Sequence, residues 1–224
     1  MSGTRDLVIV GAGGFALEVL GCVEAINHAA MEAGEGAHWR IIGLADDRMA
    51  GAAAETTSYD LLCRPDEIAA TCGPHTFIHI AVGDNKARRD LASKLAAQAL
   101  AAATLVSPKA DISPHATLGA GTFVAANAVV APQAAVGQHV ILNVGSVVGH
   151  EARLGDYAQV SPNGVVTGRC IIGEGGYLGS NASIYPTCTV GDYAAIASNS
   201  FAVGDVAAGE TVIGVPAKGV FKRK

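Results

Sequence analysis

Aromatic and charged residues are scarce in this chain. Of its 224 residues, 5% are aromatic and 16% are charged, whereas 50% are hydrophobic. So low a charge excludes a disordered chain and a coiled coil, because both are strongly charged. With so few aromatic side chains, the core must be filled by Ala, Val, Ile and Leu. The length allows one large domain or two small ones.

Several targeting and binding features are also missing. No window approaches the roughly 18 to 20 apolar residues of a membrane helix, and Met1–Asp6 does not begin a signal peptide. The net charge of −5 disfavours a nucleic-acid surface. The five cysteines include no CxxC pair, and their odd number suits a reducing compartment better than disulfides or zinc. We therefore expect a cytoplasmic protein with no nucleic-acid partner, no membrane partner and no metal.

Glycine, by contrast, is abundant, with 28 residues, and the first glycine cluster forms a motif. The apolar run Leu7–Val10 predicts a buried strand, and a helical pattern covers about Phe15 to His28. Between them, residues 11–16 form the pattern G-x-G-x-x-A. Glycines in such a turn let a phosphate approach the N-terminus of the helix. The same motif is also compatible with a tight turn that binds no ligand.

Two further strands are predicted at Arg40–Leu44 and Thr76–Val82, and each is followed by polar residues. Asp46 and Asp47 follow the first of these strands, and the segment 83–85 (Gly-Asp-Asn) follows the second. Parallel sheets bind ligands at the carboxyl ends of their strands. Residues 1–104 are therefore predicted to form a small parallel α/β domain, Rossmann-like, that binds a nucleotide or nucleotide sugar. It is too short for the full dinucleotide fold of a dehydrogenase.

Residues 105–224 are dominated by a repeat of six. Every sixth residue is aliphatic, without one slip of register: Val106, Ile112, Leu118, Val124, Val130, Val136, Leu142, Val148, Leu154, Val160, Val166, Ile172, Leu178, Ile184, Val190 and Ile196. A small residue usually lies two positions earlier, and Gly often follows at the corner. This pattern predicts an all-β domain, a left-handed parallel β-helix in which three hexads make one 18-residue coil. The unbroken register also predicts that no long loop projects from it.

The chain ends with the segment Gly214-Val215-Pro216-Ala217. With the hexads and the glycine-motif domain, this segment makes the chain resemble the hexapeptide-repeat acyltransferases. Within them it is similar to the sialic acid O-acetyltransferase and bacillosamine- or perosamine-type amino-sugar N-acetyltransferase family. The resemblance implies a homotrimer that uses acetyl-CoA as co-substrate, bound between coils, and a nucleotide-linked sugar as acceptor. It implies direct attack on the thioester without an acyl-enzyme.

The resemblance also implies the site residues. It places the catalytic base on a His followed by an acid, which here is His150 with Glu151; the third hexad position of His150 predicts an outward-facing ring. The carried-over acetyl-CoA positions are Gln159, Gly168, Ser180 and Ser198, and Lys218 in the basic tail is a further candidate. The carried-over acceptor positions are Gly13, Gly14, Phe15, Asp46, Asp47, Gly83, Asn85 and Asn143.

Two positions depart from the family pattern. The family often has His where this chain has Gln159, and Gln can donate a hydrogen bond but cannot titrate. The family's glycine motif often ends in His, and this chain has Phe15 there. Both departures leave the identity of the acceptor sugar open.

The leading hypothesis is acetylation of the amino group of a nucleotide-linked amino sugar, and O-acetylation of sialic acid or another sugar is a close alternative. A γ-type carbonic anhydrase is a distant one, since that family also uses this β-helix and three histidines. The repeat histidines His115, His139 and His150 do not have the spacing it requires. A non-catalytic solenoid is the last alternative, and the His150–Glu151 pair argues against it.

Overall fold

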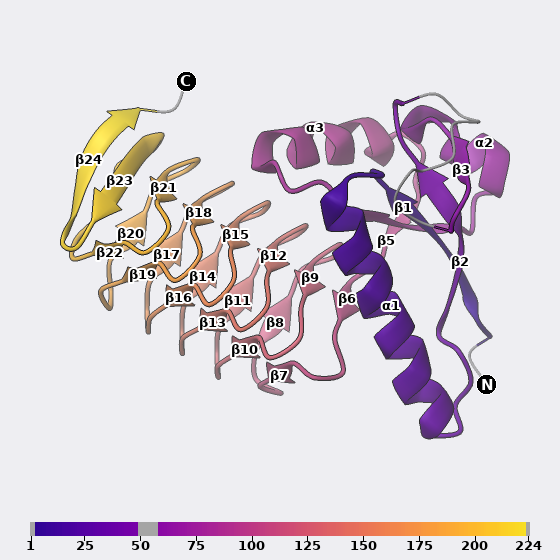
Figure 1. Ribbon diagram of the computed structural model, residues 1–224, viewed down its shortest axis with the longest axis horizontal. Coiled ribbons are helices and arrows are strands. Elements are labelled where there is room, and N and C mark those ends of the chain that lie inside the picture. Colours follow the sequence, from indigo (N-terminus) through magenta and orange to yellow (C-terminus); the bar gives the residue numbers. More distant parts are fainter. Residues whose placement is uncertain (1–2, 49–57, 223–224) are drawn as a thin grey trace. The chain divides into compact units, whose positions relative to one another are not determined.

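The computed structural model describes residues 3–48 and 58–222, and it divides into two compact units, Met1–Pro108 and Lys109–Lys224 (Figure 1). The first unit confirms the predicted α/β class. Its elements in chain order are β1 (Arg5–Val10), α1 (Gly14–Glu32), β2 (Trp39–Ala45), β3 (Leu61–Cys63), the 3-10 turn η1 (Pro65–Glu67), α2 (Ile68–Cys72), β4 (Phe77–Ile80), α3 (Asn85–Ala96) and β5 (Ala101–Ala102). The sheet has the order β3-β2-β1-β4-β5, and every pairing is parallel.

The central strand β1 has apolar side chains on both faces of this sheet. Val8 and Val10 join the buried cluster that also contains Ile78 and Leu95, so α3 covers that face. Leu7 and Ile9 alternate to the other face and are completely buried, and α1 packs against β1. Among the described residues, no helix combines the length and the apolarity needed to cross a membrane.

The predicted left-handed β-helix makes up the second unit, and its first strand lies at the end of the first unit. Two-residue strands recur every six residues: β6 (Leu105–Val106), β7 (Asp111–Ile112), β8 (Thr117–Leu118), β9 (Phe123–Val124), β10 (Val129–Val130), β11 (Ala135–Val136), β12 (Ile141–Leu142), β13 (Val147–Val148), β14 (Arg153–Leu154), β15 (Gln159–Val160), β16 (Val165–Val166), β17 (Ile171–Ile172), β18 (Tyr177–Leu178), β19 (Ser183–Ile184), β20 (Thr189–Val190), β21 (Ala195–Ile196) and β22 (Phe201–Ala202). The longer strands β23 (Glu210–Gly214) and β24 (Ala217–Lys222) form an antiparallel pair at the end. As predicted, no long loop interrupts the strands between β7 and β22.

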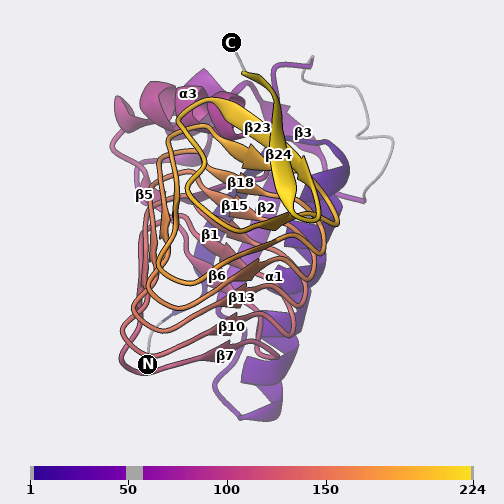
Figure 2. The same ribbon diagram turned by 90° about the vertical axis from the view of Figure 1, so that its left-hand side faces the viewer.

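The strands stack into three parallel faces. The six-strand face has the order β22-β19-β16-β13-β10-β7, the five-strand face β20-β17-β14-β11-β8, and the eight-strand face runs from β24 and β23 through β21, β18, β15, β12 and β9 to β6. Figure 2 looks along the stack, with each coil lying over the next. Partners in neighbouring coils are 18 residues apart, as in the pairing of Val148 with Val166. Residues 18 apart at a corner therefore form a ridge parallel to the stack.

The interior of the β-helix is filled as the hexads predict. The thirteen aliphatic residues from Val124 to Ile196 are all buried, whereas Val106, Ile112 and Leu118 are partly exposed. The small residue Cys170 is also buried, and Cys188 lies in register with it one coil further on. Aliphatic and small side chains alternate inward because a triangular coil leaves no interior room for rings.

The glycines at the corners of the β-helix are not there to supply the left-handed φ of a tight turn. At every corner from residue 121 to residue 199, the third residue after the inward aliphatic has a left-handed φ, and most of these residues are not glycine. The glycine that directly follows an aliphatic is needed because the next coil passes close by. A Cβ on Gly149, for example, would lie 2.7 Å from the backbone nitrogen of Gly168. Close coil contact, rather than φ, therefore explains these glycines.

Truncating one inward residue is expected to destabilise the β-helix strongly. Leu178 is fully buried, so Leu178→Ala is expected to lower the free energy of unfolding by about 2 to 5 kcal/mol. The matched control is Ile171→Ala, since the side chain of Ile171 points outward and is 48% exposed. Chemical denaturation measures both variants. Equal losses in the two would contradict the inward assignment.

Candidate active site

His150 and Glu151 form a hydrogen-bonded pair at an exposed corner of the β-helix. They lie between β13 on the six-strand face and β14 on the five-strand face, and their side chains are 57% and 47% exposed. The imidazole Nδ1 lies 3.0 Å from Glu151 Oε2. A carboxylate can only accept, so Nδ1 carries the proton and Nε2 is left as the basic nitrogen. The outward orientation predicted for His150 is therefore what the fold produces.

The backbone of this corner is fixed by its neighbours along the ridge. Glu151 N donates to Pro132 O in the preceding coil at 3.1 Å, and His150 O accepts from Arg169 N in the following coil at 2.9 Å. Glu151 has a left-handed φ of 58°, as the equivalent residue has at the other corners. The pair is therefore carried on a rigid element rather than on a mobile loop, which favours precise placement of a base.

Gly168 lies on the same ridge, one coil beyond His150. A Cβ added to Gly168 would lie 2.5 Å from His150 Nε2 and 2.8 Å from its Cε1. The imidazole therefore lies over the Gly168 backbone, in space that any larger residue would occupy. Among the described residues, none accepts a hydrogen bond from the Gly168 N–H. A basic nitrogen and an uncommitted amide donor thus occur side by side.

The other residues predicted to bind the cofactor lie elsewhere on the β-helix. Ser180 and Ser198, which are 18 residues apart, lie at the corner between the eight-strand and six-strand faces. Asn143, predicted as an acceptor contact, lies at the same corner, which is called the Asn143 ridge below. Gln159 lies on the eight-strand face in β15, and Lys218 lies in β24. Within one copy, the six-strand face separates the Asn143 ridge from His150. The structure therefore does not gather all of the predicted residues into one site of a single chain.

Two of these residues have distinctive surroundings. The side chain of Asn143 is largely buried, and its Oδ1 accepts a hydrogen bond from Val144 N at 2.7 Å. Gln159 Oε1 is buried and has no hydrogen-bond partner in the described part of the chain. A buried amide oxygen without a partner is costly, and binding of a donor there would recover that cost.

The repeat histidines are not arranged as a metal site. His139 lies on a different corner from His150, where its ring stacks on Tyr157 with centroids 5.6 Å apart. His115 lies on the His150 corner, but two coils before Glu151. Within residues 3–48 and 58–222, no three His, Cys, Asp or Glu side chains group as metal ligands would.

In the first unit, the glycine motif lies next to the end of β4. The strand order reverses between β1 and β4, and such a switch point is where open α/β sheets bind ligands. Gly11 has a φ of +107°, and a Cβ there would lie 3.0 Å from Ala81 O. Gly13, Gly14 and Gly83 have no atom within 4 Å of an added Cβ. The predicted loops after β1 and β4 thus meet, with open space above their glycines.

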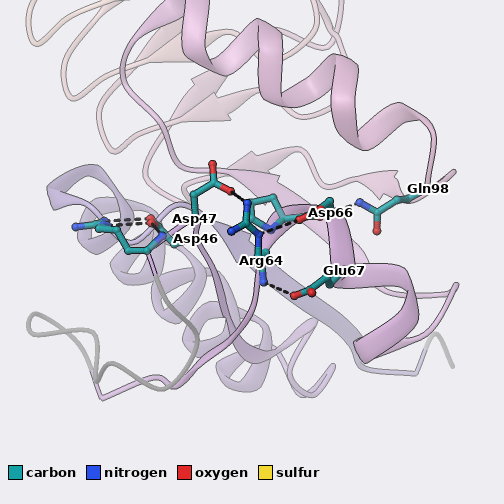
Figure 3. A network of polar contacts seen from close by, with 8 residues as sticks. Asp46, Asp47, Arg64, Asp66, Glu67 and Gln98 are labelled. Atoms are coloured by element: carbon teal, nitrogen blue, oxygen red, sulfur yellow. Dashed lines mark hydrogen bonds and ion pairs between the residues drawn. The ribbon is translucent and has the colours of Figure 1, made fainter.

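The acidic residues after β2 are placed differently from one another. Asp46 Oδ2 accepts from Ala12 N at 2.7 Å, and its carboxylate pairs with Arg48 at 2.9 Å. The hydrogen bond from Arg48 lowers the pKa of Asp46 to about 2. Asp47 is exposed and points toward Arg64 at 3.5 Å (Figure 3). Asp46 therefore holds the glycine loop, whereas Asp47 makes a longer, exposed ion pair with Arg64.

The arginines of this region are functional candidates that the sequence motifs did not indicate. Arg48 and Arg64 partner the two acidic residues, and Arg88 is buried behind the β4–α3 loop. These arginines could have been found from the sequence, because each lies close to a strand end that is rich in Gly or Asp. Their partners could not be identified, because Arg64 and Asp47 are far apart in the chain.

Known proteins share the sequence pattern and the fold of this chain. The family model of the PglD N-terminal domain matches residues 6–95. The acetyltransferase domain of PglB from Neisseria gonorrhoeae FA1090, solved with acetyl coenzyme A, is 29% identical; the match covers 97% of this chain and 100% of that one, with a TM-score of 0.82. PerB from Caulobacter crescentus, solved with CoA and GDP-perosamine, is 25% identical over 99% of both chains, with a TM-score of 0.83. No protein in the curated set matches significantly.

The fold and these neighbours indicate the class of protein that this chain resembles. The chain resembles the acyltransferases of the hexapeptide-repeat class, and the resemblance expected from the hexads is confirmed. More particularly, it is similar to the acetyltransferase domain of PglB and to the perosamine N-acetyltransferase PerB, and its residues 6–95 match the PglD N-terminal domain.

Proposed function

We propose that this enzyme transfers an acetyl group from acetyl-CoA to the amino group of a nucleotide-linked amino sugar. The observation that carries the proposal is the His150–Glu151 pair, with Nε2 over the Gly168 backbone. The PerB structure, which contains CoA and GDP-perosamine, supports the same pair of substrates here. O-acetylation of a sugar hydroxyl is the second candidate, since His150 could deprotonate either nucleophile.

In the proposed reaction, His150 is the general base. Nε2 accepts a proton from the acceptor nitrogen while that nitrogen forms a bond to the acetyl carbonyl carbon. Glu151 holds the proton on Nδ1 and stabilises the imidazolium that results. The C–S bond then breaks, and the CoA thiolate leaves. No acyl-enzyme forms, and neither Cys170 nor Cys188 takes part.

The developing oxyanion needs a donor, and Gly168 N–H is the nearest candidate to the base. It has no acceptor in the described part of the chain, and its lack of a side chain leaves room for the thioester. A preorganised donor of this kind is typically worth about 10² to 10³ in rate. Gln159, Ser180, Ser198 and Lys218 remain the proposed contacts for the rest of the cofactor, and Asn143 a proposed contact near the acceptor.

The nucleotide is proposed to bind at the switch point of the first unit. The α1 N-terminus has no side-chain cap at Gly13 and no acidic residue in its first turn, whereas Asp84 caps α3 through Ala87 N at 2.8 Å. A helix of 19 residues with uncapped N–H groups attracts phosphate. Phe15, in the first turn, offers a ring face instead of the imidazole that is common in the family, and Asp47 offers a carboxylate for sugar hydroxyls.

A second copy of the chain is proposed to complete the cofactor site. The separation of His150 from the Asn143 ridge supports this, because a neighbouring β-helix could present its own ridge to His150. We expect a homotrimer in the cytoplasm. Analytical ultracentrifugation should give three times 22.5 kDa. A stable monomer with full activity would contradict the shared site.

The experiment that tests the function measures thiol release from acetyl-CoA. The acceptors are UDP-, GDP-, dTDP- and CMP-linked sugars, each as an amino sugar and as its hydroxyl counterpart. Turnover with amino sugars alone supports N-acetylation. Turnover with hydroxyl sugars alone supports the second candidate, and turnover with none overturns both.

A further inference from the structure

An arginine that the proposed chemistry does not use lies close to His150 in the chain. Arg153 follows Glu151 by two residues, in β14, and its side chain is exposed. In the described part of the chain, that side chain makes neither an ion pair nor a hydrogen bond. Glu151, the acidic residue nearest to it in sequence, is bonded to His150 Nδ1 instead. The guanidinium of Arg153 can therefore pair with a ligand.

Arg153 also lines a hollow on the five-strand face of the β-helix. The hollow has a volume of about 390 Å³, and Arg153 is the one charged residue among the described residues that line it. Ala135 and Ile171 lie in register with Arg153 in the preceding and following coils, and both contribute to the apolar lining. Small-molecule pockets are typically about 300 to 1,000 Å³, mostly apolar, with a few polar groups. The hollow has this size and this chemistry.

A second arginine follows Gly168, the glycine on which the His150 ring lies. The backbone N–H of Arg169 donates to His150 O at 2.9 Å. Its side chain is exposed and has no partner among the residues that the structure describes. The whole chain has a net charge of −5, so two unpaired cations near one imidazole are not a general property of its surface. They indicate that the ligand at His150 carries a negative charge.

The proposed substrates contain phosphates, and an acceptor sugar can also carry a carboxylate. The diphosphate of the nucleotide is already assigned to the N-terminus of α1. The phosphates of acetyl-CoA are separated from its thioester by the whole pantetheine arm, whereas Arg153 lies in the same coil as the base that acts at the thioester. A carboxylate on the sugar is close to the reacting group, and a guanidinium binds a carboxylate through two parallel hydrogen bonds. The position of Arg153 therefore favours the carboxylate.

We propose that Arg153, with Arg169 as a second cation, binds a carboxylate on the acceptor, so that the preferred acceptor is a nucleotide-linked acidic sugar such as an amino uronic acid or a sialic acid. The sugar ring occupies the hollow, with its less polar face on Ala135 and Ile171. This inference rests on the proposed function and deepens it, since it names the chemical class of the acceptor.

The first test compares acceptors that differ only in the carboxylate. One pair carries the nucleotide that the wild type prefers, linked to an amino uronic acid or to the corresponding neutral amino hexose. The other pair is a CMP-linked sialic acid and its carboxamide. In the thiol-release assay, kcat/KM is expected to be at least about tenfold higher for the acid of one pair, the effect of a charge-assisted hydrogen bond. No preference for the acid in either pair would overturn the proposal.

The second test is Arg153→Gln, which removes the charge and keeps an amide donor. Because the side chain is exposed, the thermal midpoint should not change. The kcat/KM for the acidic sugar is expected to fall about tenfold, while kcat/KM for its neutral counterpart and the KM for acetyl-CoA stay within about twofold. Arg169→Gln is expected to lower the same kcat/KM by about threefold. Arg40→Gln is the matched control, because Arg40 is an exposed arginine that pairs with Asp6 at the start of β2.

The outcomes distinguish this inference from the proposed function. A raised KM for acetyl-CoA in Arg153→Gln, with the preference for the acid unchanged, would show that Arg153 binds a phosphate of the cofactor, and the proposal would be wrong. If the wild type turns over nucleotide sugars without preferring an acid, only this inference fails. If it turns over no nucleotide sugar, the proposed function fails, and this inference with it.

Discussion

Replacing His150 by alanine is expected to lower kcat by about 10³-fold, within the range of about 10² to 10⁴ that general-base catalysis contributes. The reason is that Nε2 of His150 is the basic nitrogen at this corner, and no other histidine lies at the corner between β13 and β14. The side chain is more than half exposed, so its removal leaves no cavity in the core. Thiol release from acetyl-CoA, with the acceptor at saturation, measures the loss.

The controls for this prediction separate chemistry from folding. His115→Ala removes an exposed imidazole from the same corner, two coils before Glu151, and should leave kcat unchanged. Glu151→Gln keeps an acceptor for Nδ1 but removes the charge, so its kcat should lie between those of the wild type and His150→Ala. A His150→Ala enzyme that retains wild-type kcat would show that the base lies elsewhere.

Adding one methyl group at Gly168 is expected to lower kcat by about 10²-fold, the scale of losing a well-placed catalytic group. The new Cβ would lie 2.5 Å from His150 Nε2, which is closer than two such atoms can approach. The imidazole must therefore rotate away from the reacting nitrogen. Gly168 does not have a left-handed φ, so the backbone itself tolerates alanine. Gly204→Ala is the matched control, because an added Cβ there meets no atom within 4 Å.

A double-mutant cycle makes this prediction sharper. If Gly168→Ala acts by displacing the imidazole, it should cost little in the His150→Ala background, where no ring remains to collide with. The two effects on kcat would then be far from additive. Fully additive losses would show instead that Gly168 acts on catalysis independently of His150.

The sequence predicted most of the fold, and it did so through period rather than composition. Sixteen aliphatic residues at intervals of six fix which side of each strand faces inward, because a one-residue slip would expose all of them. In the first unit, β1, β2 and β4 were recognisable as apolar runs. The strand β3 was not, since Leu61–Cys63 spans only three residues and lacks any periodic pattern.

The candidate site was predicted less completely. The neighbours His150 and Glu151 could be paired from the sequence, because residues adjacent at a corner stay adjacent in space. The spacing of 18 residues also placed Gly168 beside His150. Asp46 was predicted to face a ligand, yet its carboxylate is committed to Ala12 N and Arg48, which a linear pattern does not reveal.

By itself, then, the sequence determined the repeat, its inward residues and the exposed His–Glu pair, because each depends on local spacing. Only the tertiary structure decided which nitrogen of His150 is free, that Gly168 must lack a side chain, and that Asn143 and His150 lie on different ridges. It also decided that Arg153 lines a hollow on the five-strand face. These features depend on contacts between coils or loops, where an ångström determines whether two groups bond or collide, and no residue pattern encodes distances at that scale.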